Sequence, residues 1–443
     1  MNDMSPQATR LEAIGGAYDR WLLGAALALA TIGVIMVASA SVALAGDPTY
    51  YLKRHLVHLA LGAALAIGVM QLELRKVEEY NKWLLGGCFA LLFLVMLPGL
   101  GHSVNGAQRW VRLPGLGVFQ MVEAVKVLYI IWLSSYLVRF ADEVNATWAA
   151  LIKPLGVVMA LVAMLLLQPD FGSSVLLCGI TVALLVLGGG NLPKMAMPAL
   201  LGGAALVAIA VFEPYRLRRI TSFVDPWADQ LGSGYQLTNA LMAIGRGEWT
   251  GVGLGASIQK LNYLPEAHTD FIFSVLAEET GFAGVCVVIA LLSLLIGRAL
   301  WLGMQCVEQR RHFSGYVAYG VALWLGMQAF ISMGVNLGML PTKGLTLPLI
   351  SAGGSSVMMT CVAVGVLLRV SWEYQRAVRR QSWRIAGGLD DAAPAAADED
   401  EEPVPAAAPL RATEVAARAQ QHAAVRGTSR LQSRVEPTFG DLR

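Results

Sequence analysis

The 443-residue sequence predicts an all-α, polytopic integral membrane protein with about ten transmembrane helices. Three observations predict this class. Apolar residues make up 56% of the chain, charged residues only 14%, and the mean hydropathy is +0.57, which excludes an ordinary soluble globular protein. About ten apolar runs approach the ~20 residues that span a bilayer core of ~30 Å. Backbone in contact with lipid must then be helical, because its polar groups find no water there.

Lys and Arg mark the cytoplasmic side of the membrane. Residues 1–20 are expected to form a cytoplasmic N-terminal segment, and Arg75, Lys76 and Lys82 lie in the first inner loop. Arginines that follow the last apolar run place the C-terminus inside as well. The ten runs cover residues 21–45, 55–69, 83–97, 121–138, a run ending at 167, a run from the break at 168–172 to the glycines at 188–190, a run ending at 213, 271–296, 315–337 and a run ending at 369.

The fourth run contains two opposite charges, Glu123 and Lys126, which stand three positions apart and share one helix face. Such charges are costly in a membrane span unless they pair or face water. They are read either as a buried structural ion pair or as the floor of a cavity used by substrate. A polar break at residues 168–172 separates the fifth and sixth runs, and Asp170 in it is expected to cap the sixth helix.

The segment 214–270 is the one sizeable insertion between spans, and the helix count places it outside as a large periplasmic loop between helices seven and eight. It is basic, which suggests an anionic partner such as a lipid headgroup or a pyrophosphate. Leu237, Leu241 and Ile244 recur at helical spacing, and they predict an amphipathic helix that lies on the bilayer surface.

Asp270 ends this loop, at the point where water meets the membrane. A single in-line displacement at a sugar linked to pyrophosphate needs one carboxylate to remove the acceptor proton, and cations to stabilise the leaving group. Asp270 fits that role, but Thr269 and Asp270 also fit the N-cap of helix eight. Glu278 and Glu279, in the first turns, are read first as structural. His268 has no second His or Cys at metal-ligand spacing.

The last loop, residues 341–356, looks re-entrant, and such backbone is tolerated at membrane depth only where it is buried or lines a cavity. Residues 373–443 are expected to be a cytoplasmic tail, disordered from about 387, where Ala, Pro and acidic residues dominate. The five cysteines show no CxxC spacing, so neither a disulfide framework nor a metal cluster is expected.

Seven stretches together resemble the SEDS family (shape, elongation, division and sporulation) of peptidoglycan polymerases, over about residues 20–372. They are NGAQRW (105–110), QPDFG (168–172), YRLRRITSFVDPW (215–227), GSGYQLTNALMAIGRG (232–247), GVGLGASIQKLNYLPEAHTDFIF (251–273), EETGFAG (278–284) and LPTKGLTLPLISAGGSS (340–356). The resemblance implies a ten-helix membrane domain, residues 21–372. It also implies polymerisation of lipid II into β-1,4-linked glycan strands in septal cell-wall synthesis, with release of undecaprenyl pyrophosphate.

Carried over by position, the resemblance makes Asp270 the catalytic base and Glu123 and Lys126 the charged pair of a central cavity. The candidates for contact with pyrophosphate are Arg109, Arg246 and Lys343. Glu266 and His268 are substrate-binding candidates that could instead only shape their loop. The chain departs from the usual family pattern at Gln120–Glu123, before the fourth helix, and at Ala352, where Tyr is common.

The resemblance further implies a multi-pass protein of the bacterial inner membrane at the division septum. Its expected partners are lipid II, a cognate class B penicillin-binding protein with transpeptidase activity, and other septal division proteins; no nucleic acid is expected. No protein metal site is indicated, and a requirement for a divalent cation, Mg²⁺ or Mn²⁺, stays open. Two other functions remain: a lipid II flippase or transporter, and a division scaffold that recruits a transpeptidase.

Overall fold

A computed structural model describes residues 16–42, 49–104, 107–113, 117–191, 193–198, 200, 202–204, 222–261, 263–341 and 344–383. The chain divides into a compact unit of residues 1–381 and a second unit of residues 382–443. The description below concerns the first unit.

Seven described helices are long and apolar enough to cross a membrane. They are α2 (Arg20–Ala40), α3 (Tyr50–Met70), α6 (Met121–Arg139), α8 (Trp148–Leu167), α13 (Ile272–Glu308), α14 (His312–Asn336) and α15 (Gly354–Trp383). Two shorter apolar helices are α5 (Asn81–Met96) and α9 (Phe171–Leu187). These helices coincide with the predicted spans except the seventh, whose run to Glu213 falls mainly outside the described residues.

Two helices continue far beyond the predicted C-terminal ends of their spans. α13 continues to Glu308, past the predicted end at 296, and α15 continues to Trp383, past the predicted end at 369. Charged residues in these extensions find partners: Arg298 pairs with Asp19, and Arg369 Nε lies 2.8 Å from Glu373 Oε1. Hydropathy marks the part of a helix that lies in lipid, whereas a helix with paired charges can continue into water.

The expectation of an all-α chain is wrong in the loop before α6. This loop forms an antiparallel sheet of three strands in the order β1-β2-β3: β1 (Gly101–Val104), β2 (Ala107–Leu113) and β3 (Gly117–Gln120). Val111 of β2 packs with Val95 of α5 and Met121 of α6. The segment joins two spans outside the apolar runs, so the rule that lipid-exposed backbone must be helical does not govern it.

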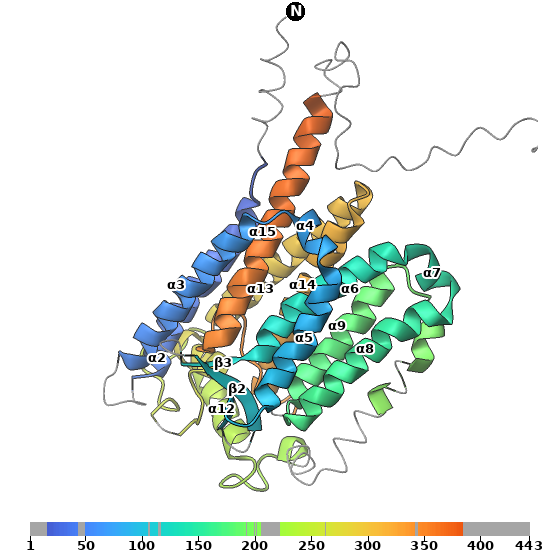
Figure 1. The fold of residues 1–443 in the computed structure, drawn as a ribbon. Coiled ribbons are helices and arrows are strands. Elements are labelled where there is room, and N and C mark those ends of the chain that lie inside the picture. Colours follow the sequence, from blue (N-terminus) through green and yellow to red (C-terminus); the bar gives the residue numbers. More distant parts are fainter. Residues whose placement is uncertain are drawn as a thin grey trace, which may run out of the picture. The chain divides into compact units, whose positions relative to one another are not determined.

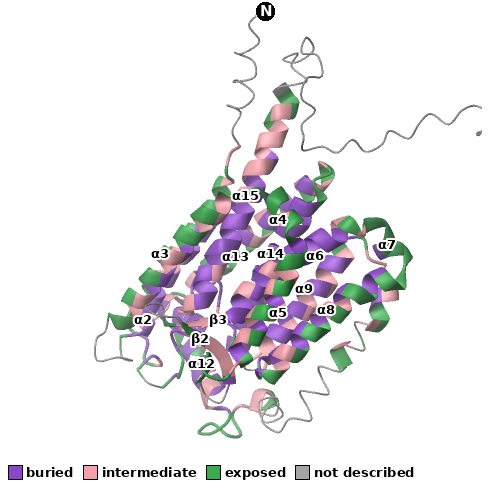
Figure 2. Cartoon of the chain, viewed as in Figure 1, coloured by how far each residue is buried: buried purple, intermediate pink, exposed green. Residues whose placement is uncertain are grey.

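Helix α3 lies at the edge of the helical assembly, and α6 and α15 lie at its centre. Over an 18-residue apolar stretch of each helix, 83% is buried in α6 and in α15 but only 17% in α3. Figure 2 shows the same difference. One core cluster joins α2, α13, α14 and α15, and a second joins α5, α6, α8 and α9. α14 packs against α13, α6 and α9 and so links the two clusters.

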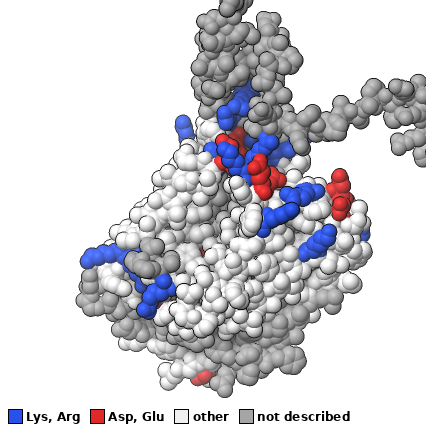
Figure 3. Space-filling model, in the orientation of Figure 1, with Lys and Arg blue, Asp and Glu red and all other residues white. Residues whose placement is uncertain are grey.

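The connecting segments separate into two ends (Figure 1). The short helices α4 (Leu74–Glu79) and α7 (Ala141–Ala146) lie at one end, here the α4 end. The sheet and α12 (Tyr235–Gly247) lie at the other, the α12 end. Most charged residues of the visible face gather at the α4 end, and a broad uncharged belt separates them from a smaller group of Lys and Arg near the far ends of α2 and α3 (Figure 3). The predicted inner and outer loops thus lie at opposite ends.

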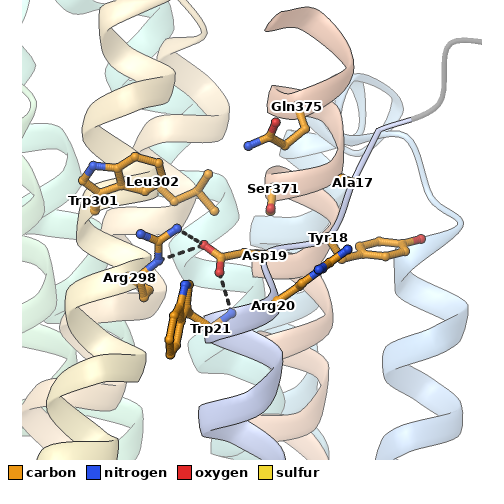
Figure 4. A pocket seen from close by; sticks show the side chains of 10 residues that line it. All are labelled: Ala17, Tyr18, Asp19, Arg20, Trp21, Arg298, Trp301, Leu302, Ser371 and Gln375. Atoms are coloured by element: carbon orange, nitrogen blue, oxygen red, sulfur yellow. Dashed lines mark hydrogen bonds and ion pairs between the residues drawn. The ribbon is translucent and has the colours of Figure 1, made fainter. Parts of the chain in front are cut away.

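Asp19 fixes the beginning of α2 at the α4 end. Its Oδ1 accepts hydrogen bonds from Trp21 N and Leu22 N, at 2.9 and 3.1 Å. Its Oδ2 accepts bonds from Nε and Nη2 of Arg298, at 2.9 and 2.5 Å. Arg298 in turn stacks on Trp301, and these side chains line a small pocket between α2, α13 and α15 (Figure 4). The pair therefore fastens the start of the first described helix to α13.

The amphipathic helix predicted from Leu237 exists as α12. Leu237 is buried, Leu241 and Ile244 are half-buried, and α12 packs against α13; its position on the bilayer surface stays a prediction. Apolar residues of α12 thus contact protein. A hydrophobic face read from sequence does not distinguish a protein neighbour from a lipid one.

Candidate functional site

Asp270 lies half-buried immediately before α13. The N-cap of α13 is Phe271, whose side chain makes no capping hydrogen bond, so Asp270 lies one residue before the cap position. The Asp270 main-chain carbonyl accepts a hydrogen bond from Asn336 Nδ2 at 2.9 Å. A Cβ atom added to Gly344 would lie 3.1 Å from Asp270 Oδ2. The carboxylate therefore faces the irregular segment 344–353 that precedes α15.

Glu266 shapes the turn that leads to Asp270. Its φ is +56°, and its carbonyl accepts hydrogen bonds from Thr269 N and Phe271 N, at 3.1 and 3.2 Å. Its exposed carboxylate accepts a bond of 2.7 Å from Thr269 Oγ1. Of the two roles considered for Glu266, the structure gives direct contacts for shaping the loop.

His268 links the loop to two other elements. Its ring stacks on Tyr51 of α3, with 4.4 Å between ring centroids, and its carbonyl accepts a 2.9 Å hydrogen bond from Ala352 N. The side chain is buried, and among the described residues Nδ1 has no hydrogen-bond partner. Burial lowers the pKa of His268, helped by nearby Arg54 and opposed by Glu266. A neutral imidazole is therefore favoured beside Asp270.

Glu123 and Lys126 form the ion pair that their spacing predicts. Lys126 Nζ lies 2.7 Å from Glu123 Oε2, and their side chains are 0% and 6% exposed, respectively. Lys126 also donates a 2.8 Å hydrogen bond to Gln328 Oε1 of α14 and lies over the ring of Trp324. Glu123 Oε2 has the Lys126 charge nearby but no hydrogen bond of good geometry within the described residues. The contacts of the pair with α14 thus run through Lys126.

Gln328 connects the ion pair to the irregular segment. Its Nε2 donates a hydrogen bond to the Thr346 carbonyl at 3.0 Å, and Thr346 Oγ1 bonds to Ser356 Oγ at 2.7 Å. Asp270 and the ion pair therefore face the same segment from different elements. The buried contacts fit the reading of the pair as a structural ion pair, and its role as the floor of a substrate cavity stays a prediction.

The predicted pyrophosphate contacts are placed as follows. Arg109 of β2 donates a 3.0 Å hydrogen bond to the Gln168 carbonyl and a second bond to the Pro169 carbonyl. Arg246 of α12 forms an ion pair of 2.7 Å with Glu278, and its side chain is 42% exposed. Lys343 lies outside the described residues. Both described arginines thus hold protein groups in this structure.

Three neighbouring carboxylates have structural contacts. Asp170 is the N-cap of α9, as predicted, and its Oδ1 accepts a 3.2 Å hydrogen bond from Ser173 N. Glu278 and Glu279 are buried in ion pairs with Arg246 and Lys260, both at 2.7 Å. Their structural reading agrees with these contacts.

Sequence reasoning missed two polar residues of α14, Gln328 and Asn336. Both are buried, and each bridges two segments of the site. The available signal was an uncharged polar side chain in an apolar span, a type of residue that commonly bonds across helices. Their partners could not be read from sequence, because those partners lie on segments distant along the chain.

These features define a polytopic membrane protein in which a half-buried carboxylate and a buried ion pair are both linked to an irregular segment between two apolar helices. A family model described as cell cycle protein, FtsW/RodA/SpoVE, matches residues 20–376. The chain belongs to this family, which is the SEDS family that the motifs resemble.

Curated relatives and solved structures agree with this membership. A Xanthomonas oryzae pv. oryzae protein named "Probable peptidoglycan glycosyltransferase FtsW" is 62% identical, over 100% of this chain and 94% of its own. A Nitrosococcus halophilus protein of the same name is 50% identical, over 82% and 95%. A chain from a peptidoglycan synthase complex, solved in work on coordinated polymerization and crosslinking, is similar with TM-score 0.67 and 31% identity, over 81% and 98%. Rod shape determining protein RodA of Thermus thermophilus is similar with TM-score 0.60 and 29% identity, over 80% of this chain and 97% of its own.

Proposed function

We propose that this chain is a peptidoglycan glycosyltransferase that polymerises lipid II into β-1,4-linked glycan strands, with Asp270 as the general base. The names of relatives up to 62% identical support the reaction class. The observation that carries the residue assignment is the position of Asp270: a half-buried carboxylate that lies one residue before the cap position of its helix and faces an irregular segment above a buried polar network.

In the proposed reaction, Asp270 removes the proton of the acceptor hydroxyl while that oxygen bonds to the anomeric carbon of the donor. The bond from that carbon to the pyrophosphate breaks in the same step, so the anomeric centre is inverted. Undecaprenyl pyrophosphate leaves with the electron pair of the broken bond. The lipid-linked donor accounts for a site at the boundary between apolar spans and polar loops.

Cations stabilise the leaving pyrophosphate. Arg109, Arg246 and Lys343 are the proposed contacts, and they would have to exchange protein partners for phosphate where they are already bonded. Among the described residues there is no group of three or more His, Cys, Asp or Glu arranged for a metal ion.

We also propose ten membrane spans, with the α4 end and both termini in the cytoplasm and the α12 end in the periplasm. The solved complex that coordinates polymerization and crosslinking supports a partner with transpeptidase activity, here a class B penicillin-binding protein. Other septal proteins and a location at the septum of the inner membrane belong to the same proposal.

Polymerisation of labelled lipid II by the purified protein, with its transpeptidase partner added, tests the assignment. Asp270→Ala and Asp270→Asn should lower the rate at least ~10²-fold, the smaller contribution typical of a general base. Asp229→Asn is a matched control, since Asp229 is an exposed carboxylate whose hydrogen bonds among the described residues lie within its own turn. Polymer formed by Asp270→Ala at the wild-type rate would exclude Asp270 as the base. A transporter or a scaffold would remain active in transport or recruitment with either substitution.

A further inference from the structure

Helix α13 is interrupted at Gly281, where φ is 65° and ψ is −167°. The interruption separates a short helical piece, residues 272–280, from the long span 282–308. This short piece, called the carrier helix below, starts two residues after Asp270. A helix end leaves carbonyls and amides without partners in the helix, so the groups at Gly281 need partners elsewhere.

Residues 247–253, called the clamp loop, supply these partners from both sides of the interruption. Val252 N and Gly253 N donate to the carbonyls of Glu278 and Glu279, at 3.0 and 3.1 Å. Beyond Gly281, Phe282 N and Ala283 N donate to the carbonyls of Glu248 and Trp249, at 2.9 and 3.1 Å. The clamp loop thus fixes the end of the carrier helix by main-chain hydrogen bonds.

Side chains strengthen the same attachment. Glu279 Oε1 accepts from Lys260 Nζ at 2.7 Å, and both Glu279 oxygens accept from Ser39 Oγ of α2, at 2.6 and 2.8 Å. Glu278 Oε2 accepts a 2.5 Å bond from Ser257 Oγ. Both carboxylates are buried. Their partners come from α2 and from the loop after α12, so the end of the carrier helix is tied to two other parts of the fold.

Asn336, at the end of α14, holds the beginning of the carrier helix by side-chain hydrogen bonds. Its Nδ2 donates to the Asp270 carbonyl at 2.9 Å and to the Ser332 carbonyl at 2.8 Å. Its Oδ1 accepts from Ser274 N and Ser274 Oγ, at 3.2 and 2.8 Å. Asn336 is 0% exposed. The carboxamide thus fixes the main chain on either side of the point where α13 begins.

We propose that Asn336 and Glu279 are positioning residues for Asp270, at opposite ends of the carrier helix. The carrier helix acts as a rigid mount: the interruption at Gly281 uncouples it from the long span, and the two attachments set where the Asp270 carboxylate meets the segment 344–353. Asn336 acts on the Asp270 main chain directly, and Glu279 acts through the far end of the mount. The inference rests on the proposed role of Asp270.

The sharpest test replaces Asn336. Asn336→Asp keeps an acceptor for Ser274 and loses the donor to the Asp270 carbonyl, whereas Asn336→Leu loses both. Because a misplacement of ~1 Å can cost about 10²-fold in rate, kcat should fall by about 10-fold to 10²-fold, with KM for lipid II changed less than about 2-fold. Asn336→Leu should be the slower variant, and Ser274→Ala should lose part of the rate.

Thr181→Val is the matched control, because it also removes a buried hydrogen bond between helices, 2.8 Å from Tyr129 Oη to Thr181 Oγ1, outside the carrier helix. It should keep kcat even where it lowers thermal stability. At the far end, Glu279→Gln and Lys260→Met should each lower kcat, and the double variant should recover part of it, because it leaves no unpaired buried charge.

Hydrogen–deuterium exchange of residues 263–280 gives a readout independent of activity. Exchange should rise in Asn336→Leu and Glu279→Gln and stay unchanged in Thr181→Val. Wild-type kcat in Asn336→Leu, or a rise in KM alone, would overturn the positioning role while leaving Asp270 as the base. If exchange rises in the Asn336 and Glu279 variants as expected but Asp270→Ala keeps full activity, the proposed function is overturned instead.

Discussion

Lys126 shows how one buried charge can organise several elements. Its ammonium group meets Glu123, Gln328 and the Trp324 ring, and its side chain is fully buried. Spacing alone predicted the pair, since residues three apart share a helix face. The link from Lys126 through Gln328 to the segment before α15 could not be predicted, because it depends on how α6 packs against α14.

Removing one member of this ion pair should lower the stability of the fold more than removing both. Glu123→Gln or Lys126→Met leaves an unpaired buried charge and should lower the free energy of unfolding by ~3–5 kcal/mol, whereas a neutral pair is often tolerated. Unfolding in detergent micelles, followed for the two single variants and the double variant, measures this. A double variant as unstable as the sum of the single variants would show that the two charges do not compensate each other.

His268 should make stability depend on pH. Burial lowers its pKa from the ordinary value of 6.5, so the folded protein binds this proton less readily than the unfolded chain. Stability should be constant well above pH 6.5 and should fall as pH decreases through and below that value. In His268→Gln the decrease in melting temperature between pH 7.5 and pH 5.5 should be smaller. An identical decrease in both proteins would assign the effect to other groups.

At the scale of elements, apolar runs predicted the membrane helices well, because lipid allows the backbone few alternatives. The same runs gave no sign of the interruption in α13, since the sequence around Gly281 remains apolar on its far side. The runs likewise gave no sign that α12 packs against α13. Such features depend on contacts between distant segments, which periodicity does not record.

The interruption in α13 should be intolerant of a side chain. A Cβ atom at Gly281 would overlap the main chain of Thr250 and Gly251, and its φ of 65° is unfavourable for other residues. Gly281→Ala should therefore lower folded yield and polymerase activity together. Gly297→Ala on the same helix is the control: no atom lies within 4 Å of its added Cβ, and Ala stabilises a helix by up to ~1 kcal/mol over Gly. Equal yields for the two variants would contradict a tight contact at Gly281.

At the scale of the whole molecule, the predicted inner and outer loops lie at opposite ends, as the distribution of Lys and Arg indicated (Figures 1 and 3). The three-stranded sheet was not predicted. Its strands are only 4, 7 and 4 residues long, and glycine and proline around them read as an irregular loop. The site was predictable as a set of residue types near Asp270, whereas its supports from α14 required the packed structure.

Labelling in intact cells checks the proposed orientation. A cysteine introduced as Ser233→Cys, in the loop before α12, should react with a membrane-impermeant maleimide added outside. Asn145→Cys in α7 should react only after the inner membrane is permeabilised. Both residues are exposed, and the background needs the five native cysteines replaced. The reverse pattern would invert the proposed topology.

The contact between Gly251 and Gly281 also has an evolutionary consequence. A side chain on Gly251 would overlap the main chain of Glu279 and Thr280, and one on Gly281 would overlap Gly251. A substitution at one position cannot remove the steric overlap at the other, since each glycine meets backbone atoms and not a side chain that could be replaced. Selection for cell division from a library randomised at both codons should therefore recover glycine at both, with no compensating pairs. Each of the two positions would then be restricted to glycine on its own account.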